Sequence, residues 1–219
     1  MVVVDHEKRE GSKTMARLTA SIAKLSRREG YALHPKAHKI LARRPTPPGG
    51  QKKAGRPSVS SQYAIQLREK QKVKRLYGLL EKQFTNLVHE SQRKQGPTGE
   101  LLLRFLEQRL DNVVYKSGFA NSRRASRQLV THGHFLLNGK RVDIPSIRVV
   151  AGDEVIIRDS SKNNNYFQNI NELSPPINDA PAWLKVDRKK FKISITGLPS
   201  REDAEPDINE QLIVEYYSR

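Results

Sequence analysis

The run Ser122-Arg-Arg-Ala-Ser-Arg-Gln-Leu-Val-Thr-His-Gly-His-Phe-Leu-Leu-Asn-Gly-Lys-Arg-Val142 decides the fold of the middle of the chain. Ser122 is a favoured N-cap residue and Gly133 a favoured helix terminator, so a helix is predicted over about 123–132. Asn138-Gly139 then favours the tight turn of a β-hairpin between two short strands. A helix that leads directly into a hairpin is therefore expected here.

The sequence on either side extends this unit. Upstream, Pro97 discourages helix before it, and apolar residues then recur at helical spacing from Leu102 as far as Lys116. Downstream, a Gly-Asp turn leads into an alternating strand over 154–158. Residues 98–162 are thus predicted to form a compact α+β module.

The strongest helical signal lies before this module, over about 61–95. Its apolar residues fall on one face of a 3.6-residue period: Val73, Leu76, Tyr77, Leu80, Phe84 and Leu87. Cations group on the far side: Arg68, Lys72, Arg75 and Lys82. A break is expected near Gly78 or Asn86, because few globular helices run much past about 25 residues without caps.

The two ends of the chain give weaker signals. Residues 1–14 are expected to be a disordered extension, and Met15 resembles a natural start. Short helices are predicted over 21–28 and from His34 to about Ala42. The Pro- and Gly-rich stretch over 45–57 is predicted to be a basic loop, with a plain linker as the alternative.

The C-terminal segment, 163–219, contains an alternating run over 191–195 and the apolar run Leu212-Ile-Val-Glu-Tyr-Tyr217. That last run is too apolar to remain in water. We expect residues from about 183 to 219 to pack back on the helical region over 15–97, which they would complete.

Positive charge is concentrated at the front of the chain. Of 219 residues, 40 are Lys or Arg and 23 are Asp or Glu, giving a formal net charge of +17. Net charge is +15 over 1–97, +4 over 98–162 and −2 over 163–219. This asymmetry indicates a polyanionic partner, with nucleic acid the first candidate and a merely solvated surface the alternative.

Several classes of protein are excluded by composition. The chain has no cysteine, which excludes a disulfide framework, a Cys nucleophile and any cysteine-ligated zinc or iron–sulfur site. No apolar run approaches the roughly 18 residues of a membrane span. The N-terminus places its apolar residues before its charges, the reverse of a signal peptide.

Five stretches, in this order, resemble the bacterial-type family of the fourth protein of the small ribosomal subunit: Leu25-Ser-Arg-Arg-Glu-Gly30, Tyr63-Ala-Ile-Gln-Leu-Arg-Glu-Lys-Gln-Lys-Val-Lys-Arg-Leu-Tyr-Gly78, Arg109-Leu-Asp-Asn-Val-Val-Tyr115, Arg127-Gln-Leu-Val130 and Asp207-Ile-Asn-Glu-Gln-Leu-Ile-Val-Glu-Tyr216. The resemblance covers about 15–219. Residues 98–162 resemble the small RNA-binding domain of that family, which pseudouridine synthases, tyrosyl-tRNA synthetases and a heat-shock ribosome-rescue factor also carry.

The resemblance implies an α+β protein with a mainly helical N-terminal domain and the small RNA-binding domain. It implies a ribosome-bound, cytoplasmic structural protein that binds small-subunit ribosomal RNA early in assembly, at a multi-helix junction of the 5′ domain. It further implies support of decoding accuracy, near the channel by which mRNA enters and beside the third and fifth ribosomal proteins of the subunit. No cofactor or membrane contact is implied.

The sequence departs from the family pattern at two places. Some relatives carry an N-terminal cysteine cluster that holds zinc, and its absence here implies a zinc-free variant. The loop that usually contains Pro-Gly-Gln-His-Gly is Pro48-Gly-Gly-Gln-Lys-Lys-Ala-Gly55 in this chain. Its basic character remains, while residues 160–182 match the family weakly.

Charge neutralisation and recognition of shape are the expected mechanism, since the deep major groove of an RNA duplex excludes side chains. Arginine suits this task because its planar fork bridges phosphate oxygens and stacks on exposed bases. The predicted RNA-binding residues are Arg27, Arg28, Arg43, Arg44, Lys52, Lys53, Arg56, Arg68, Lys72, Arg75, Arg109, Lys116, Arg123, Arg124, Arg127, Lys140 and Arg141. The helix over 123–132 and the hairpin after it are expected to share one groove.

The alternative function is an RNA-modifying enzyme with the same anchor module, because Arg109-Leu110-Asp111 resembles part of the pseudouridine-synthase motif. A catalytic domain needs well over 100 residues, and only 57 follow residue 162. Asp111 is expected to form a helix-surface ion pair or cap instead. The chain is therefore expected not to be an enzyme.

Two histidine pairs, His34 with His38 and His132 with His134, have a spacing that could ligate a metal. Neither pair has the further ligands that complete a zinc site, so no metal is expected. His132 is interpreted as an RNA contact or a helix C-cap.

Overall fold

The computed structural model describes residues 18–49, 61–175 and 180–218. Its elements follow in the order α1 (Ile22–Glu29), α2 (Ala37–Arg43), α3 (Gln62–Leu76), α4 (Glu81–Arg93), α5 (Thr98–Glu107), α6 (Leu110–Lys116), α7 (Arg123–Thr131), β1 (Phe135–Leu137), β2 (Lys140–Val142), β3 (Glu154–Ile157), α8 (Asp159–Lys162), α9 (Asn165–Gln168), α10 (Ile170–Leu173), β4 (Leu184–Asp187), β5 (Lys192–Ile195) and α11 (Glu210–Tyr217). None of these helices is long and apolar enough to cross a membrane.

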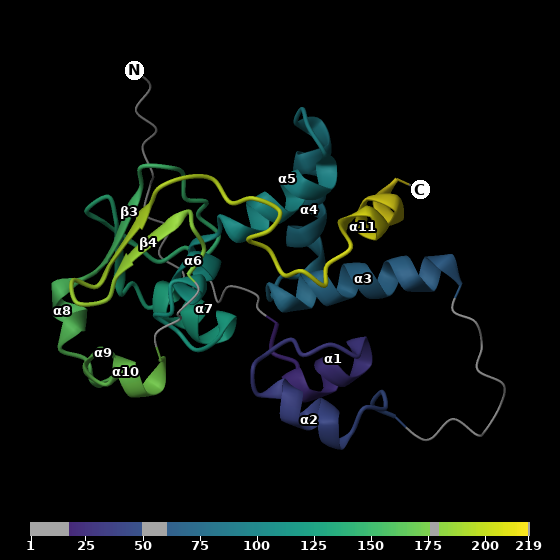
Figure 1. The fold of residues 1–219 in the computed structure, drawn as a ribbon, viewed down its shortest axis with the longest axis horizontal. Helices are drawn as coiled ribbons and strands as arrows, with labels where there is room; N and C mark the ends of the chain where they lie inside the picture. The colour runs from purple at the N-terminus through teal and green to yellow at the C-terminus, as the bar shows by residue number, and fades with distance from the viewer. Residues whose placement is uncertain (1–17, 50–60, 176–179, 219) are drawn as a thin grey trace, which may run out of the picture.

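Two hydrophobic cores organise the described residues. The helical core joins α3, α4 and α5 to the C-terminal segment through residues such as Val73, Phe84, Leu102 and Ile213. The second core lies between α6, α7 and the sheet, with Phe135 among its fully buried side chains. Figure 1 shows the helical part at one end of the molecule and the sheet at the other.

The predicted helix over 61–95 is two helices. Gly78, between α3 and α4, has a φ of 67°, a left-handed conformation that glycine adopts without strain. The chain turns there, so that α3 and α4 bury their apolar faces in one core. The expected break near Gly78 is confirmed.

The helix predicted from residue 98 to 116 is also divided, at Gln108 and Arg109, where Arg109 forms an isolated bridge with Arg148. The helix before the break, α5, belongs to the helical core and approaches α11 closely. A Cβ added to Gly99 would lie 2.6 Å from the Cγ of Glu210. The division between the two cores therefore falls after α5, and the expected boundary at residue 98 is corrected.

The sheet is antiparallel, with strand order β2-β1-β3-β5-β4. The predicted hairpin is confirmed: Leu137 pairs with Lys140 across a turn in which Asn138 and Gly139 have φ angles of 49° and 79°. Both central residues of a type I′ turn need positive φ, which explains the Asn-Gly pair.

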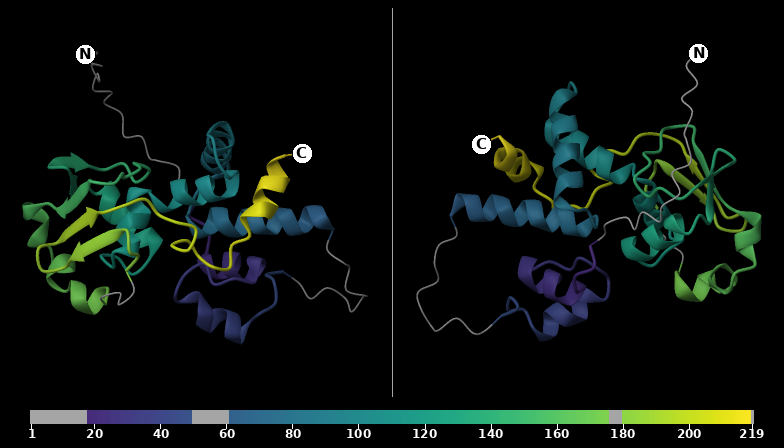
Figure 2. Two further views of the ribbon diagram at one scale, coloured as in Figure 1. Left: turned by 45° about the horizontal axis from the view of Figure 1, so that its top comes forward. Right: turned by 180° about the vertical axis from the view of Figure 1, so that it is seen from behind.

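The C-terminal segment serves both cores: α11 packs on the helical region as expected of about 183–219, whereas the strands before it join the sheet. Strand β5 pairs with β3, and β4 pairs with β5, so residues 184–195 widen the sheet. Trp183 and Ile193 fill the core beneath it. The chain then crosses to the helical part, where α11 lies against α3, as both views in Figure 2 show.

The N-terminal helices are confirmed, with α1 following Ser21 and α2 ending at Arg43. The stretch over 160–165, within the part that matches the family weakly, contains the end of α8 and the start of α9. The predicted extension over 1–14, with Met15, and most of the basic loop, including Lys52, Lys53 and Arg56, lie outside the described residues.

Candidate nucleic-acid interface

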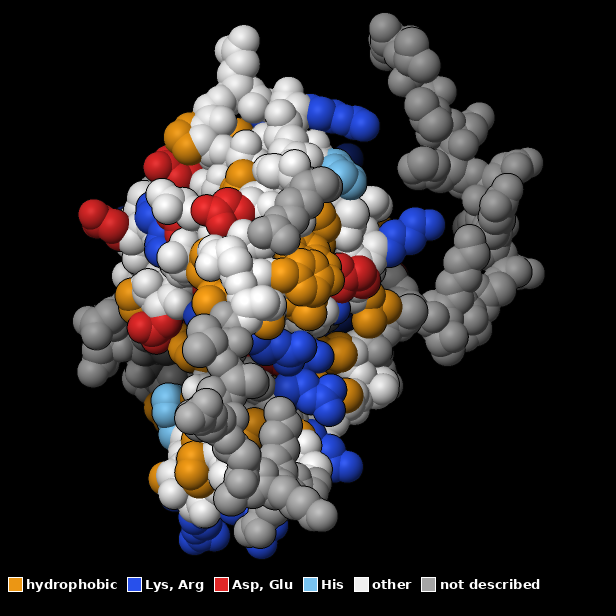
Figure 3. Space-filling view, turned by 90° about the vertical axis from the view of Figure 1, so that its right-hand side faces the viewer, with side chains coloured by type: hydrophobic (Ala, Val, Ile, Leu, Met, Phe, Trp, Pro, Cys, Tyr) orange, Lys and Arg blue, Asp and Glu red, His pale blue; other side chains and the backbone are white. Residues whose placement is uncertain are grey.

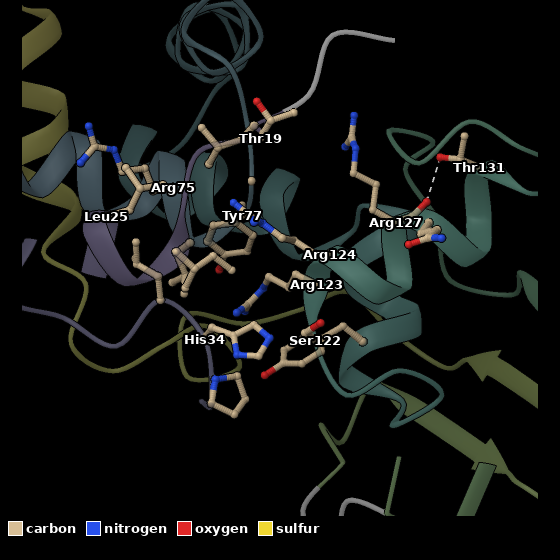
Figure 4. A pocket seen from close by; sticks show the side chains of 18 of the residues that line it. Thr19, Leu25, His34, Arg75, Tyr77, Ser122, Arg123, Arg124, Arg127 and Thr131 are labelled. Atoms are coloured by element: carbon tan, nitrogen blue, oxygen red, sulfur yellow. Dashed lines mark hydrogen bonds between the residues drawn. The ribbon is translucent and has the colours of Figure 1, made fainter. Parts of the chain in front are cut away.

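A hollow of about 570 Å³ lies where α1 and the segment before α2 face α7 and the end of α3. The segments around it come from sequence positions far apart, such as Leu25, Tyr77 and Arg127. Figure 4 shows the side chains of Arg123 and Arg124 extending from α7 toward Tyr77. His34 lies beside the end of Arg123, on the side of that arginine away from Tyr77. The hollow is thus built jointly by the N-terminal helices and the small module.

The lining combines apolar side chains with cations. Its titratable cationic or basic residues are Arg75, Arg123, Arg124, Arg127, His34 and His132. Its apolar and aromatic residues include Leu18, Ile22, Leu25, Leu33, Leu76, Tyr77 and Tyr115. Among the described residues, no Asp or Glu lines it. A hollow of this kind attracts anions that also have apolar surface.

Helix α7 places three of these arginines. It begins after Ser122, whose Oγ accepts a hydrogen bond from the backbone N–H of Ala125 at 3.3 Å. This N-cap satisfies one of the unpaired N–H groups of the first turn. The predicted helix over 123–132, with this cap, is confirmed. His132 is the residue that ends it, as one of its two interpretations expected.

Arg123 is held firmly at the junction of the two cores. It donates to Asn112 Oδ1 at 2.9 Å and to Glu205 Oε1 at 3.0 Å. Its guanidinium carbon lies 4.8 Å from the ring centre of Tyr77 and 4.7 Å from that of Tyr115. Burial alone would lower the pKa of Arg123, but the surrounding Tyr and Glu oxygens raise it above its usual value.

Asp111 binds two of the predicted arginines inside the protein. Arg109 donates to both carboxylate oxygens, at 3.0 and 2.8 Å, and Arg127 donates to Oδ2 at 3.0 Å. The expected ion pair of Asp111 is confirmed, but its expected place on the helix surface is wrong because the residue is 5% exposed. Arg109 is equally buried, at 4%, and therefore does not present its side chain to a partner.

Three predicted cations on α3 also have partners in the chain. Arg68 and Arg75 both donate to Oε1 of Glu29, which fixes α1 against α3. Burial raises the pKa of Glu29 more than these arginines lower it. Lys72 pairs with Glu69 at 2.8 Å and donates to a backbone carbonyl before α11.

Lys116 and Arg124 make contacts with backbone. Lys116 donates to the carbonyl of Asp203 at 3.1 Å and lies 4.0 Å from Glu205. Arg124 is exposed and uses one Nη to donate to the carbonyl of Ala20 at 2.8 Å. Its remaining N–H groups have no partner among the described residues.

A second group of predicted cations is exposed. Arg28, Arg43 and Arg44, here called the outer arginines, make no side-chain hydrogen bond or ion pair with a described residue. Arg27 donates to the carbonyl of Thr46 at 2.9 Å. Figure 3 shows Lys and Arg side chains gathered in the lower part of one end of the molecule, on the side of α1 and α2.

The hairpin does not line the hollow, and the expectation that it shares one RNA-facing groove with α7 stays a prediction. Lys140 is exposed, and the Arg141 guanidinium lies against Gly133, where a Cβ would be 2.7 Å from its Nε. The structure therefore brings together Arg75, Arg123, Arg124 and Arg127 around the hollow and places Arg141 of the hairpin beside Gly133, which directly follows the lining residue His132.

His34 is a lining residue that the sequence did not identify as an RNA contact. Its Nδ1 accepts the backbone N–H of Lys36 at 3.0 Å, which leaves Nε2 as the donor of the neutral ring. Burial, with nearby Lys36 and Arg124, lowers the pKa of His34 and favours that neutral form. No local pattern signals that His34 lines the hollow, because the helix that faces it, α7, lies far along the chain.

The histidines do not complete a metal site in the part of the chain that the structure describes, where no group of three His, Cys, Asp or Glu residues could hold an ion. His132 and His134 lie edge to face, with ring centres 5.9 Å apart. The Nδ1 of His134 is hydrogen bonded to the hydroxyl of Ser161 at 3.0 Å.

Comparison with known proteins gives two family matches. The model described as Ribosomal protein S4/S9 N-terminal domain matches residues 17–107, and that described as S4 domain matches residues 108–155. Their junction coincides with the division between the two cores.

Curated relatives match almost the whole chain. Small ribosomal subunit protein uS4 of Chlorobaculum tepidum is 49% identical over 206 residues, which cover 94% of this chain and 100% of the relative. The uS4 proteins of Roseiflexus castenholzii and Chlorobium limicola are 46% and 48% identical over the same shares. These matches confirm the resemblance found in the sequence, and the chain belongs to the uS4 family of small ribosomal subunit proteins.

Proposed function

We propose that this protein is a structural component of the small ribosomal subunit that binds ribosomal RNA directly. The observation that carries the proposal is the hollow at the junction of the N-terminal helices and α7, lined by four arginines and two histidines with no acidic side chain among the described residues. Three of these arginines are paired with carboxylates that lie outside the lining, so Arg124 and the outer arginines are the cations that remain for phosphate neutralisation among the described residues. The outer arginines, on α1 and at the end of α2, are exposed and add further positive charge to the N-terminal helices.

The relatives' names are those of a ribosomal protein, which confirms that the chain is not an enzyme. The structure agrees with this for the Arg109-Leu110-Asp111 motif, which resembles part of the pseudouridine-synthase motif. Asp111 is buried and both its carboxylate oxygens accept hydrogen bonds from arginines, so it serves the fold.

The finer role follows from the family resemblance. The protein binds early in assembly at a multi-helix junction of the 5′ domain and then supports decoding accuracy near the channel by which mRNA enters, with the third and fifth ribosomal proteins as neighbours. A junction presents phosphates from several directions, which suits a protein whose cations come from both of its parts. It acts bound to ribosomes in the cytoplasm, and uses no cofactor.

Co-sedimentation with small subunits, followed by footprinting on naked small-subunit RNA, tests this proposal. The protein is expected to sediment with the subunit and to protect backbone positions from several helices of the 5′ domain. A protein that stays free of ribosomes and protects no RNA would overturn the proposal.

A further inference from the structure

We infer that the hollow between α1, the segment before α2 and α7 takes one unpaired nucleotide of the bound RNA, with the base against the apolar wall and the phosphate at Arg124. The inference rests on the proposed function, because the nucleotide belongs to an RNA that the protein already holds. It adds recognition of a single base to binding through charge and shape.

The size of the hollow fits one nucleotide and excludes a duplex. Its volume of about 570 Å³ lies within the roughly 300–1,000 Å³ of pockets that hold small ligands. A paired duplex cannot enter such a space, whereas an unstacked base from a loop or junction can be turned out of the RNA and inserted.

The wall of the hollow offers surfaces on which a flat ring can pack. Leu25 and Leu76 supply aliphatic surface, and Tyr77 and Tyr115 supply aromatic surface. The guanidinium of Arg123 packs on both tyrosine rings, so its position is fixed before any ligand arrives, and a base can pack only on the ring surface that Arg123 leaves open. Unstacked RNA bases stack on such aromatic rings and arginine planes.

The polar groups of the lining are mainly donors, which suits the acceptor-rich base edges and phosphate of a nucleotide. Neutral His34 keeps its Nε2–H for a ligand. The Oγ of Ser122 accepts from Ala125, so its hydroxyl hydrogen remains to be donated. Arg124 lies at the opening with most of its N–H groups unpaired among the described residues.

The charge of the lining distinguishes a nucleotide from a peptide. A peptide inserted here would bring backbone N–H groups that need acceptors, and the described lining supplies no carboxylate. A nucleotide brings a negative phosphate to Arg124 and an apolar ring to the wall, so both kinds of lining residue are used.

Chemical probing of the complex tests the inference. The full chain is bound to naked small-subunit ribosomal RNA, and unpaired bases are modified with dimethyl sulfate and a carbodiimide. Thr19 and Arg124 are exposed residues of the lining and mark the opening of the hollow. Two variants change this opening: Thr19→Trp fills it with a large side chain, and Arg124→Gln removes its cation. The matched control is Arg93→Gln, which removes an exposed cation at the end of α4, away from the hollow.

The wild type is expected to lower the reactivity of one unpaired base by about tenfold or more, as a stacked base requires. Thr19→Trp and Arg124→Gln are each expected to restore that reactivity, while Arg93→Gln behaves as the wild type. Circular dichroism of each variant checks that it is folded. A complex in which no base protection depends on either opening variant would overturn the inference while leaving RNA binding intact.

Free nucleotides provide the second arm of the test. The four nucleoside 5′-monophosphates and inorganic phosphate are titrated into the full chain, and the ring signals of His34 are followed by NMR. If a monophosphate shifts these signals but no base in the RNA complex depends on the opening variants, the hollow serves free nucleotides and the inference is wrong. If no RNA complex forms at all, the proposed function fails together with it.

Discussion

The arginines between the two cores and those on the N-terminal helices have the same chemistry but different surroundings. Arg109, Arg123 and Arg127, here called the seam arginines, are bound to Asp111 or Glu205 and are largely buried. The outer arginines Arg28, Arg43 and Arg44 are exposed, with no side-chain partner among the described residues. The difference teaches that a count of basic residues mixes two populations, one that is paired inside the fold and one that is exposed and that we propose binds the RNA.

The largest expected effect breaks the seam. Asp111→Asn leaves Arg109 and Arg127 buried without their carboxylate, which costs about 3–5 kcal/mol in the free energy of unfolding. Urea denaturation measures the loss. Asp143→Asn, at an exposed aspartate, is the control and should change stability by less than about 0.5 kcal/mol. Equal losses in the two variants would show that the seam pairs contribute little.

The next effect concerns the outer arginines. Replacing Arg28, Arg43 and Arg44 with Gln should leave the unfolding free energy almost unchanged and weaken binding to small-subunit RNA by about tenfold or more. The slope of log K against log salt should become shallower by about one for each phosphate that the variant no longer neutralises. Filter binding at several salt concentrations measures both quantities.

The matched control for this variant replaces three other exposed cations, Lys82, Arg93 and Lys185, with Gln. It removes the same charge from other parts of the surface. If the control weakens binding as much as the outer variant, only total charge matters, and the distinction between the two regions disappears.

A smaller effect is expected at the start of α7. Ser122→Ala removes the side-chain cap of the helix that places Arg123, Arg124 and Arg127, at a cost of about 1 kcal/mol in stability. Thermal unfolding compares it with Ser160→Ala, an exposed serine that caps no helix. No difference between the two would mean that packing alone determines where α7 begins.

The smallest effect is a difference in pH dependence between two glutamates. Burial raises the pKa of Glu205, but Arg123 and Lys116 lower it further, and the net shift is downward from 4.5. The stability that Glu205 provides is therefore present above 4.5 and lost as the pH falls through its lowered pKa. Glu29 is shifted upward, so its contribution is present below 4.5 and lost as the pH rises through its raised pKa.

Unfolding free energies of the wild type, Glu205→Gln and Glu29→Gln across acidic pH measure this difference. The difference in unfolding free energy between the wild type and Glu205→Gln should become smaller as the pH falls. The corresponding difference for Glu29→Gln should become smaller as the pH rises. Parallel curves would contradict the opposite surroundings assigned to the two carboxyls.

Local patterns predicted the elements of the fold well. The cap at Ser122, the turn at Asn138-Gly139 and the break near Gly78 each depend on a few neighbouring residues, and all three are confirmed. What could not be predicted was the partner of each element. Nothing local to residues 184–195 shows that these strands join the sheet, because β5 pairs with β3 across a long separation in sequence.

The candidate site shows the same limit. Residue type and motif identified Arg75, Arg123, Arg124 and Arg127, which do line one hollow. The sequence did not show which of the predicted arginines are buried. Arg109 and Arg124 look alike in sequence, but only Arg109 lies inside the protein, paired with Asp111. The sequence did not indicate that His34 lines this hollow, because α7 lies far along the chain and only the tertiary fold brings it near.

Salt dependence of binding to naked small-subunit RNA tests the central claim most directly, namely that unopposed cations on both parts of the protein neutralise phosphates. If about eight phosphates are neutralised, log K should fall with log salt at a slope of roughly −6 to −7, and affinity should drop by several decades between low and moderate salt. A nearly flat response would contradict the claim, because the cations would then be only a solvated surface.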